Sequence, residues 1–358
     1  MEPIRHFSYH DPNAIVSVLL KSALETTAAA DDPVYRRLPP PVRYRATGAI
    51  DAWKRVMVEG AKVGHADFGS AIPVFPVERL YDEFPRFVKG WGGSLLSGIS
   101  EHDALLAHRS LLWQIYYGSD GVMYEPTAAL HRLLDDAYIA DDVPIGLIEL
   151  PAPAMCIIPS PEWTGVKQKG IRAIAVFRRD FDTPSVRGQH LTIATWQESG
   201  GGATRLRFGS YPLSDPDKTI VQVIDDIPEG SAEDREYVLF VLGYVAKLLL
   251  YLKLPDARIE ANLAHSRASR DFRGLGERKR RERLAQIEQL YDRHVVGPAV
   301  LDWERAGGDV SEAGLSHHEK RAHWRRPHFK MQPYGPSSSL RKVIFVGPVI
   351  VRADRLSP

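Results

Sequence analysis

Residues 171–211 read IRAIAVFRRDFDTPSVRGQHLTIATWQESGGGATRLRFGSY, and this stretch decides the fold class. Three short apolar runs, at 171–179, 190–197 and 204–211, are rich in β-branched and aromatic residues and are separated by Gly, Pro and Ser. Such runs are typical of β-strands. The Ser-Gly-Gly-Gly stretch at 199–202 predicts a hairpin loop between the second and third strands.

Similar runs extend this sheet on both sides. IGLIELP (145–151), AMCIIPS (154–160) and TIVQVI (219–224) bring the expected number of strands to five or six. Ser231 and Asp234 form a capping-box pattern for a following helix. Its apolar stripe, which we expect to pack against the sheet, consists of Val238, Val241, Leu242, Val245, Leu248, Leu249 and Leu252.

The first 140 residues predict mostly helices. Asp11-Pro12 is an N-cap followed by proline and begins the first helix. Residues 49–60 and 77–87 predict two short helices. Ser100 with Asp103 begins a further helix, and Pro126 opens one that ends near residue 136. Leu284, Ile287 and Leu290 should face inward from a later helix, and the last forty residues contain strand-like pieces around 324–330 and 343–346. The expected fold is α+β. Its parts are a helical segment (1–140), a mixed or antiparallel sheet with an apolar helix (141–262), and a basic C-terminal extension with short strands (263–358).

Composition narrows the class of protein. An apolar share of 44% and a charged share of 25% are those of an ordinary globular protein. The single cysteine, Cys156, excludes an intrachain disulfide and zinc motifs. The longest apolar run (237–252) contains Lys247 and is shorter than the roughly 20 residues of a bilayer-spanning helix, and the first residues do not resemble a signal peptide. We therefore expect a cytoplasmic protein with no membrane contact.

Motifs of common enzymes fail on their spacing. Gly274-Leu275-Gly276 lacks the third glycine of a dinucleotide fingerprint, and the glycines at 200–202 are not followed by the Lys-Ser/Thr of a P-loop. His318-Glu319 has Ala322 where a metalloprotease needs its second histidine. We therefore assign no catalytic residue, no metal site and no cofactor.

Charge is distributed unevenly along the chain. From His265 to the end there are 19 Lys and Arg against 11 Asp and Glu, a net charge of +8, whereas the preceding residues carry −7. The run Arg278-Lys279-Arg280-Arg281-Glu282-Arg283 concentrates this charge, with Arg267, Arg270 and Arg273 before it. Clustered cations bind phosphates by displacing counterions. The alternative is a solvated helix face in which Glu277 and Glu282 pair with neighbouring arginines.

A second basic segment, 317–330, mixes cations with aromatic and histidine side chains. Trp324 and Phe329 would stack on unpaired bases while the cations hold the backbone; alternatively both rings lie in the core. The candidate nucleic-acid-binding residues are Arg278, Lys279, Arg280, Arg281, Arg283, Arg321, His323, Trp324, Arg325, Arg326, His328, Lys330, Arg341 and Lys342.

Two other functions remain open on these residues alone. Histidines beside cations also suit a metal-independent ribonuclease, which needs a general base, a general acid and a cation near the phosphate. A DNA-binding regulator of a mobile element is the other, although no clear helix-turn-helix pattern is present.

The tail also resembles a known family. His323-Trp324-Arg325, the turn Gln332-Pro333-Tyr334-Gly335, and Leu340-Arg341 before an apolar strand are similar to the C-terminus of the type V-A anti-CRISPR family of phage- and plasmid-borne proteins. Residues 144–159 and the leucine-rich helix before Lys253-Leu254-Pro255 are also similar to that family. Ala322 stands where the pattern has glycine, and residues 326–331 lengthen the gap before the turn.

The resemblance implies a mechanism without covalent chemistry. Members of that family are thought to recognise the N-terminal peptide of the type V CRISPR nuclease as it leaves the ribosome, and to cause loss of its mRNA. The implied partners are that peptide and RNA or the ribosome. We expect the acidic body to hold the peptide and the basic tail to face RNA; the sequence does not indicate which residues line the peptide site.

Overall fold

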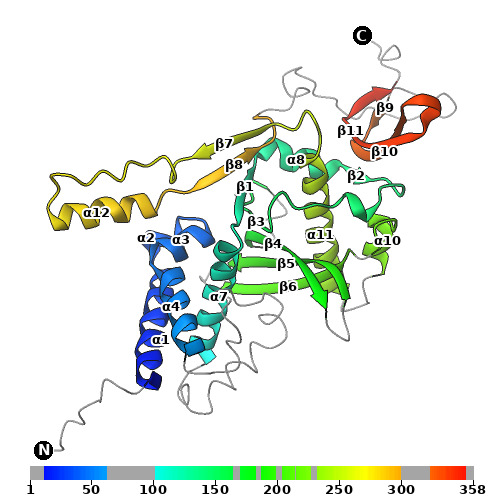
Figure 1. The fold of residues 1–358 in the computed structure, drawn as a ribbon. Coiled ribbons are helices and arrows are strands. Elements are labelled where there is room, and N and C mark those ends of the chain that lie inside the picture. Colours follow the sequence, from blue (N-terminus) through cyan, green and yellow to red (C-terminus); the bar gives the residue numbers. More distant parts are fainter. Residues whose placement is uncertain are drawn as a thin grey trace, which may run out of the picture.

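The fold is α+β, as predicted, in a computed structural model that describes residues 12–62, 101–163, 170–182, 187–198, 204–213, 215–226, 232–299 and 323–351 (Figure 1). The helices of its N-terminal part are α1 (Pro12–Ala29), α2 (Pro33–Arg36), α3 (Pro40–Ala46), α4 (Ala49–Lys62) and α7 (Glu101–Gly118). The predicted helices at 12, 49–60 and 101 are thereby confirmed, whereas the one predicted at 77–87 lies outside the described residues.

A seven-stranded mixed sheet forms the centre of the molecule, with the order β6-β5-β4-β3-β1-β8-β7. β1 runs parallel to β3 and β8, and all other neighbours are antiparallel. The strands are β1 (Val122–Pro126), β3 (Ala154–Ile157), β4 (Ile171–Asp182), β5 (Arg187–Glu198), β6 (Thr204–Pro212), β7 (Ile259–Leu263) and β8 (Asp292–Val296). The predicted strands at 154–160, 171–179, 190–197 and 204–211 are confirmed; the loop at 199–202 lies outside the described residues.

The two faces of this sheet carry different side chains because successive residues of a strand point to opposite sides. Ile174 and Val176 of β4 face α11 (Ala232–Leu252) and α8 (Ala128–Asp136). The intervening Ala173 and Ala175 face the N-terminal helices, where their small size leaves room for Trp53, Trp113 and Trp196. Figure 1 shows α7 and α11 on opposite sides of the strands. The predicted packing of the 232–252 helix on the sheet is confirmed.

Several predicted elements differ in the structure. Residues 145–147 form a 3-10 turn, η2 (Ile145–Leu147), and 220–225 form a helix, α10 (Ile220–Asp225), where strands were expected. Thr219 and Gln222 close a capping box that starts this helix, and this local pattern overrides the strand propensity of TIVQVI. Pro126 ends β1, and Thr127 caps α8 by accepting a hydrogen bond from the backbone N–H of Leu130 at 3.1 Å.

An arm consisting of residues 259–296 extends from one edge of the sheet. It comprises β7, β8 and, between them, α12 (Glu277–Glu288), which Figure 1 shows as the yellow segment reaching away from the strands. Of the three residues expected to face inward, only Ile287 is buried. Leu284 and Leu290 are 43% and 40% exposed, so that expectation is wrong for these two. The reason is that α12 projects away from the core, so most of its surface has no packing partner among the described residues.

The C-terminal residues form two small sheets. One has the order β11-β10-β2, built from β2 (Tyr138–Ile139), β10 (His328–Tyr334) and β11 (Leu340–Val346). The other pairs β9 (His323–Arg325) with β12 (Val349–Val351), and η3 (Pro336–Ser338) lies in the turn between β10 and β11. The fully buried Phe329 ties β10 to the main core, with Phe345 against it at a ring-centroid distance of 4.8 Å.

The central sheet takes strands from all three ranges into which the sequence was divided, since β1 lies before residue 140 and β8 after residue 263. The division of the chain into these three ranges stays a prediction. No helix in the described part of the chain is both long and apolar enough to cross a bilayer. The apolar run at 237–252 belongs to α11, where Lys247 Nζ donates to the carbonyl of Leu134 at 2.7 Å.

Candidate nucleic-acid interface

The arm presents its cations on an exposed helix. Between residues 264 and 288 there are eight Lys and Arg against four Asp and Glu, and Arg278 to Arg283 are all exposed. Because α12 turns by about 100° per residue, consecutive cations point in different directions around it. The helix begins at Glu277 after Gly276, whose backbone is extended.

Part of this charge is paired, as the alternative interpretation of the sequence expected. Arg278 Nε lies 3.5 Å from a carboxylate oxygen of Glu282, and Arg281 Nη2 lies 3.6 Å from one of Glu277. These exposed pairs contribute little to stability and exchange readily with other partners. Among the described residues, no carboxylate lies within ion-pair distance of Lys279 or Arg283. Both cations are therefore available to an external anion.

Two arginines of the N-terminal part, Arg45 of α3 and Arg37 after α2, hold the base of the arm. Arg45 donates from Nη2 to the carbonyls of Glu288, at 3.2 Å, and Leu290, and its Nε lies 3.4 Å from the Glu288 carboxylate. Arg37 Nη2 donates to the side-chain oxygen of Gln289 at 2.6 Å. Arg37 is the C-cap of α2 and lies between α2 and α3. The contacts fix residues 288–290 on the N-terminal helices while the cations of α12 stay exposed.

The β10–β11 hairpin, residues 328–346, carries the second group of predicted residues. Its register pairs Lys330 with Ile344, Gln332 with Lys342, and Pro333 with Arg341. Cross-strand partners share a face, so Lys330 and Lys342 lie on one face of the hairpin and Arg341 on the other. The sequence did not indicate this division. Arg325 and Arg326, just before the hairpin, are exposed.

Two aromatic residues of this tail are not available to a base. Phe329 is fully buried, so the expectation that it stacks on nucleic acid is corrected in favour of a core role. His328 is 2% exposed and stacks on Tyr138 with 5.0 Å between ring centroids and 9° between planes. It is therefore neither a surface ligand nor an accessible proton-transfer group. Arg321 and the side chains of His323 and Trp324 lie outside the described residues.

Tyr334 is an aromatic side chain that the sequence analysis missed as a site residue. It is 43% exposed, and the Lys342 Nζ lies 5.5 Å from its ring centroid, close enough for a cation–π contact. Its place in the Gln-Pro-Tyr-Gly turn, followed by Arg341 and Lys342, was the available signal. An exposed ring beside a lysine suits base stacking next to a phosphate contact.

The two cationic elements do not form one site. Figure 1 shows α12 and the β10–β11 hairpin at opposite ends of the molecule, with the central sheet between them. A polyanion that touches both would have to pass across the body, so each element is a separate candidate surface. Within the described ranges no cluster of three or more His, Cys, Asp or Glu is placed to hold a metal ion.

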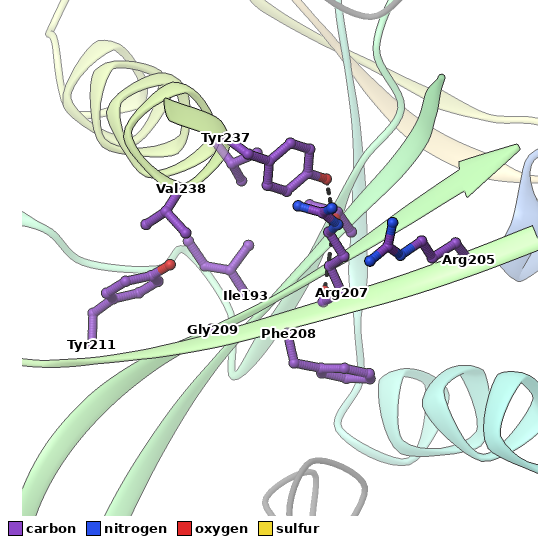
Figure 2. A pocket seen from close by; sticks show the side chains of 10 residues that line it. Ile193, Arg205, Arg207, Phe208, Gly209, Tyr211, Tyr237 and Val238 are labelled. Carbon is purple, nitrogen blue, oxygen red and sulfur yellow. Dashed lines mark hydrogen bonds between the residues drawn. The ribbon is translucent and has the colours of Figure 1, made fainter. Parts of the chain in front are cut away.

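A trough of about 290 Å³ lies between the sheet and the first turns of α11 (Figure 2). Arg205, Arg207, Gly209 and Tyr211 of β6 alternate along one side, since every second residue of a strand faces the same way. Figure 2 shows Arg207 and Tyr211 beside Tyr237 and Val238 of α11. Sequence analysis did not select these residues; the signal was the alternation of Arg with Gly and Tyr in TRLRFGSY.

At the end of the trough that contains Arg205 and Arg207, contacts within the protein hold the side chains in place. The Tyr237 hydroxyl donates to Thr195 Oγ1 at 2.6 Å, and the Arg207 guanidinium carbon lies 4.5 Å from the Tyr237 ring centroid. Burial raises the pKa of Tyr237, while the hydrogen bond to Thr195 and the charges of Arg207 and Arg205 act in the opposite direction. Tyr237 is therefore a neutral phenol at physiological pH, with two guanidinium groups close to it.

Comparison with known proteins identifies the family. The chain resembles a solved protein described as "Crystal structure of AcrVA2", with 13% identity, a TM-score of 0.46, and coverage of 86% of this chain and 96% of that one. A search of curated protein sequences returned no match. The model of the AcrVA2-like family, "Anti-CRISPR type V subtype A2 family", matches residues 124–353, which is more than half of the chain. The chain therefore belongs to the AcrVA2-like anti-CRISPR type V subtype A2 family.

Proposed function

We propose that this anti-CRISPR protein is an adaptor. It would recognise the N-terminal peptide of a type V CRISPR nuclease during translation, and lower the amount of nuclease mRNA and protein through contact with RNA or the ribosome. The family supplies the target class. No catalytic step is assigned to the adaptor itself.

The observation that carries the RNA contact is the α12 arm. Its cations stand on a helix that reaches away from the body, and Lys279 and Arg283 have no carboxylate partner among the described residues. A projecting cationic helix can approach the phosphates of a large RNA without a steric clash from the sheet, and each phosphate contact releases a counterion. The uneven charge of the chain supports the same division of roles.

The ribonuclease alternative loses one of its residues. A buried His328 whose Nδ1 lies 3.2 Å from the carbonyl of Arg326 cannot reach a substrate phosphate in this structure. No observation in the described part of the chain favours that alternative over the adaptor. Cleavage of labelled RNA by the purified protein in EDTA would nevertheless revive it.

The proposal is tested in cells that express a type V-A nuclease. Wild-type protein should lower nuclease mRNA, measured by quantitative RT-PCR, and the double variant Lys279→Glu/Arg283→Glu should lose most of this effect. The matched control is Lys54→Glu/Arg55→Glu, which makes the same charge change at two exposed residues of α4. Equal mRNA loss with the arm variant and the control would remove the arm from the proposed function.

A second comparison separates the peptide from the RNA sequence. One nucleotide is inserted at the start of the nuclease coding sequence and one is deleted a few codons later. These changes alter the encoded N-terminal peptide but leave the mRNA sequence almost unchanged. The proposal expects this mRNA to escape loss. If it is lost as fast as the parent, recognition does not pass through the nascent peptide.

A further inference from the structure

We infer that the trough between β6 and α11 binds a short extended peptide segment that carries a carboxylate next to apolar side chains. This inference rests on the proposed function, in which a peptide of the target is recognised, and it assigns that peptide a site and a chemistry. The trough is lined by Ile193, Arg205, Arg207, Gly209, Tyr211 and Val238, and Thr195, Phe208, Tyr237 and Val241 also contribute to its walls.

One part of the trough wall is apolar. Ile193 comes from β5, and Val238 and Val241 come from one side of α11. Gly209 makes room for the Tyr211 ring, because a Cβ at this position would collide with the hydroxyl end of Tyr211. The Tyr211 ring therefore lies across the glycine and forms part of the surface. Such walls favour aliphatic or aromatic side chains of a ligand.

One end of the trough is cationic. Arg205 is exposed, and Arg207 stacks on the Tyr237 ring, which is held in turn by its hydrogen bond to Thr195. A guanidinium fixed on an aromatic ring loses little side-chain entropy when it binds an anion. Charge-assisted hydrogen bonds to a carboxylate are stronger than those between neutral groups. This end is therefore complementary to an Asp or Glu side chain of the ligand.

The shape of the trough favours an extended chain. Its β6 side runs from Arg205 to Arg207, Gly209 and Tyr211, a span of six residue steps and roughly 20 Å at about 3.3 Å per residue. An extended ligand of about six residues matches this length at the same rise. The volume of about 290 Å³ lies at the small end for ligand pockets, so it accommodates a few side chains and not a folded domain.

The distribution of charge favours a peptide over a nucleic acid. Cations stand at one end only, whereas a bound strand of RNA carries a phosphate at every nucleotide and needs cations along its path. Away from Arg205 and Arg207 the described residues of the trough offer no cation to those phosphates. A peptide with one acidic residue beside apolar residues would place its carboxylate at the two arginines and its apolar side chains against Ile193, Val238 and Val241.

The test uses the full chain and a fluorescent synthetic peptide that corresponds to the N-terminus of a type V-A nuclease. A second peptide has each Asp and Glu replaced by Asn and Gln. Wild-type protein should bind the first peptide and bind the neutralised one about tenfold more weakly, a difference of about 1.4 kcal/mol. Arg205→Glu should weaken binding of the acidic peptide by at least about tenfold and nearly abolish the preference between the two peptides.

Val238→Trp provides a second variant, because it fills the apolar part without changing charge. The control is Arg55→Glu on α4, which covers the opposite face of the sheet and should bind like wild type. Wild-type affinity of both trough variants would overturn the inference and leave the proposed function intact. Failure of the wild-type protein to bind the acidic peptide would also overturn the inference. The proposed function would then be tested separately by the measurement of nuclease mRNA in cells. Competition by single-stranded RNA that disappears in Arg205→Glu, with peptide binding unchanged, would assign the trough to RNA instead.

Discussion

The imidazole Nδ1 of His131 lies 3.1 Å from the hydroxyl oxygen of Tyr244, and this contact joins α8 to α11 inside the core. On the other side of the ring, Nε2 accepts a hydrogen bond from the backbone N–H of Ser160 at 3.0 Å. Because Nε2 accepts, the proton of the neutral ring lies on Nδ1, which donates to Tyr244. A second proton on Nε2 would face the Ser160 N–H. The site therefore requires a neutral imidazole.

Burial lowers the pKa of His131 to about 3, so acid should destabilise the protein through this residue. Below pH 6.5 the unfolded chain binds a proton at His131 that the folded chain does not, and the free energy of unfolding falls by about 1.4 kcal/mol per pH unit as pH drops toward 3. Wild type should thus lose about 2 kcal/mol more than His131→Gln between pH 6.5 and 5, measured by urea unfolding. Parallel pH profiles for the two proteins would contradict this account.

Gly297 is expected to tolerate no side chain. Its φ is +100°, and a Cβ there would lie 2.5 Å from the Cβ of Leu130 on α8. Gly297→Ala should therefore cost about 2 kcal/mol or more. Gly276→Ala is the matched control, since its φ is −65° and nothing lies within 4 Å of the added Cβ. Thermal unfolding of the two variants measures the difference, and similar midpoints would disprove the steric argument.

Sequence reasoning succeeded where periodicity and packing agree. The runs that became β4, β5 and β6 lie in strands nine to twelve residues long, the short β3 is buried at every position, and the apolar stripe of α11 packs on the sheet. It failed at β1 and β8. These strands have five residues each, mix polar with apolar side chains, and are defined by pairing with strands far away in the chain. Such pairing leaves no local signal.

The candidate site shows the same limit. The exposure of α12 followed from its composition, but its separation from the β10–β11 hairpin depends on the course of the whole chain. His328 and Phe329 looked like ligands because they stand among cations, yet β10 pairs with β2 and carries both residues into the core. Arg205 and Arg207 became notable only when α11 was placed over β6.

Arg45 should control the mobility of the arm. Arg45→Met keeps the aliphatic stem and removes the donors to the carbonyls of Glu288 and Leu290. Backbone amides of residues 277–290 should then exchange hydrogen faster, while those of β4 and β5 keep their protection, because local opening needs no global unfolding. Arg37→Met, which removes one exposed contact to Gln289, should have a smaller effect. Unchanged exchange in Arg45→Met would show that other contacts hold the arm.

The phosphate contacts of α12 should be visible in the salt dependence of RNA binding. Lys279→Gln/Arg283→Gln removes two cations from exposed positions and introduces no repulsion. For single-stranded RNA each lost phosphate contact lowers the slope of log K against log salt concentration by about 0.7, so the double variant should show a slope smaller by about 1.4. Fluorescence anisotropy of a labelled RNA over a salt series provides the measurement. Lys54→Gln/Arg55→Gln on α4 should keep the wild-type slope. An arm variant with weaker binding but an unchanged slope would mean that α12 acts on RNA through arm structure and not through its charges.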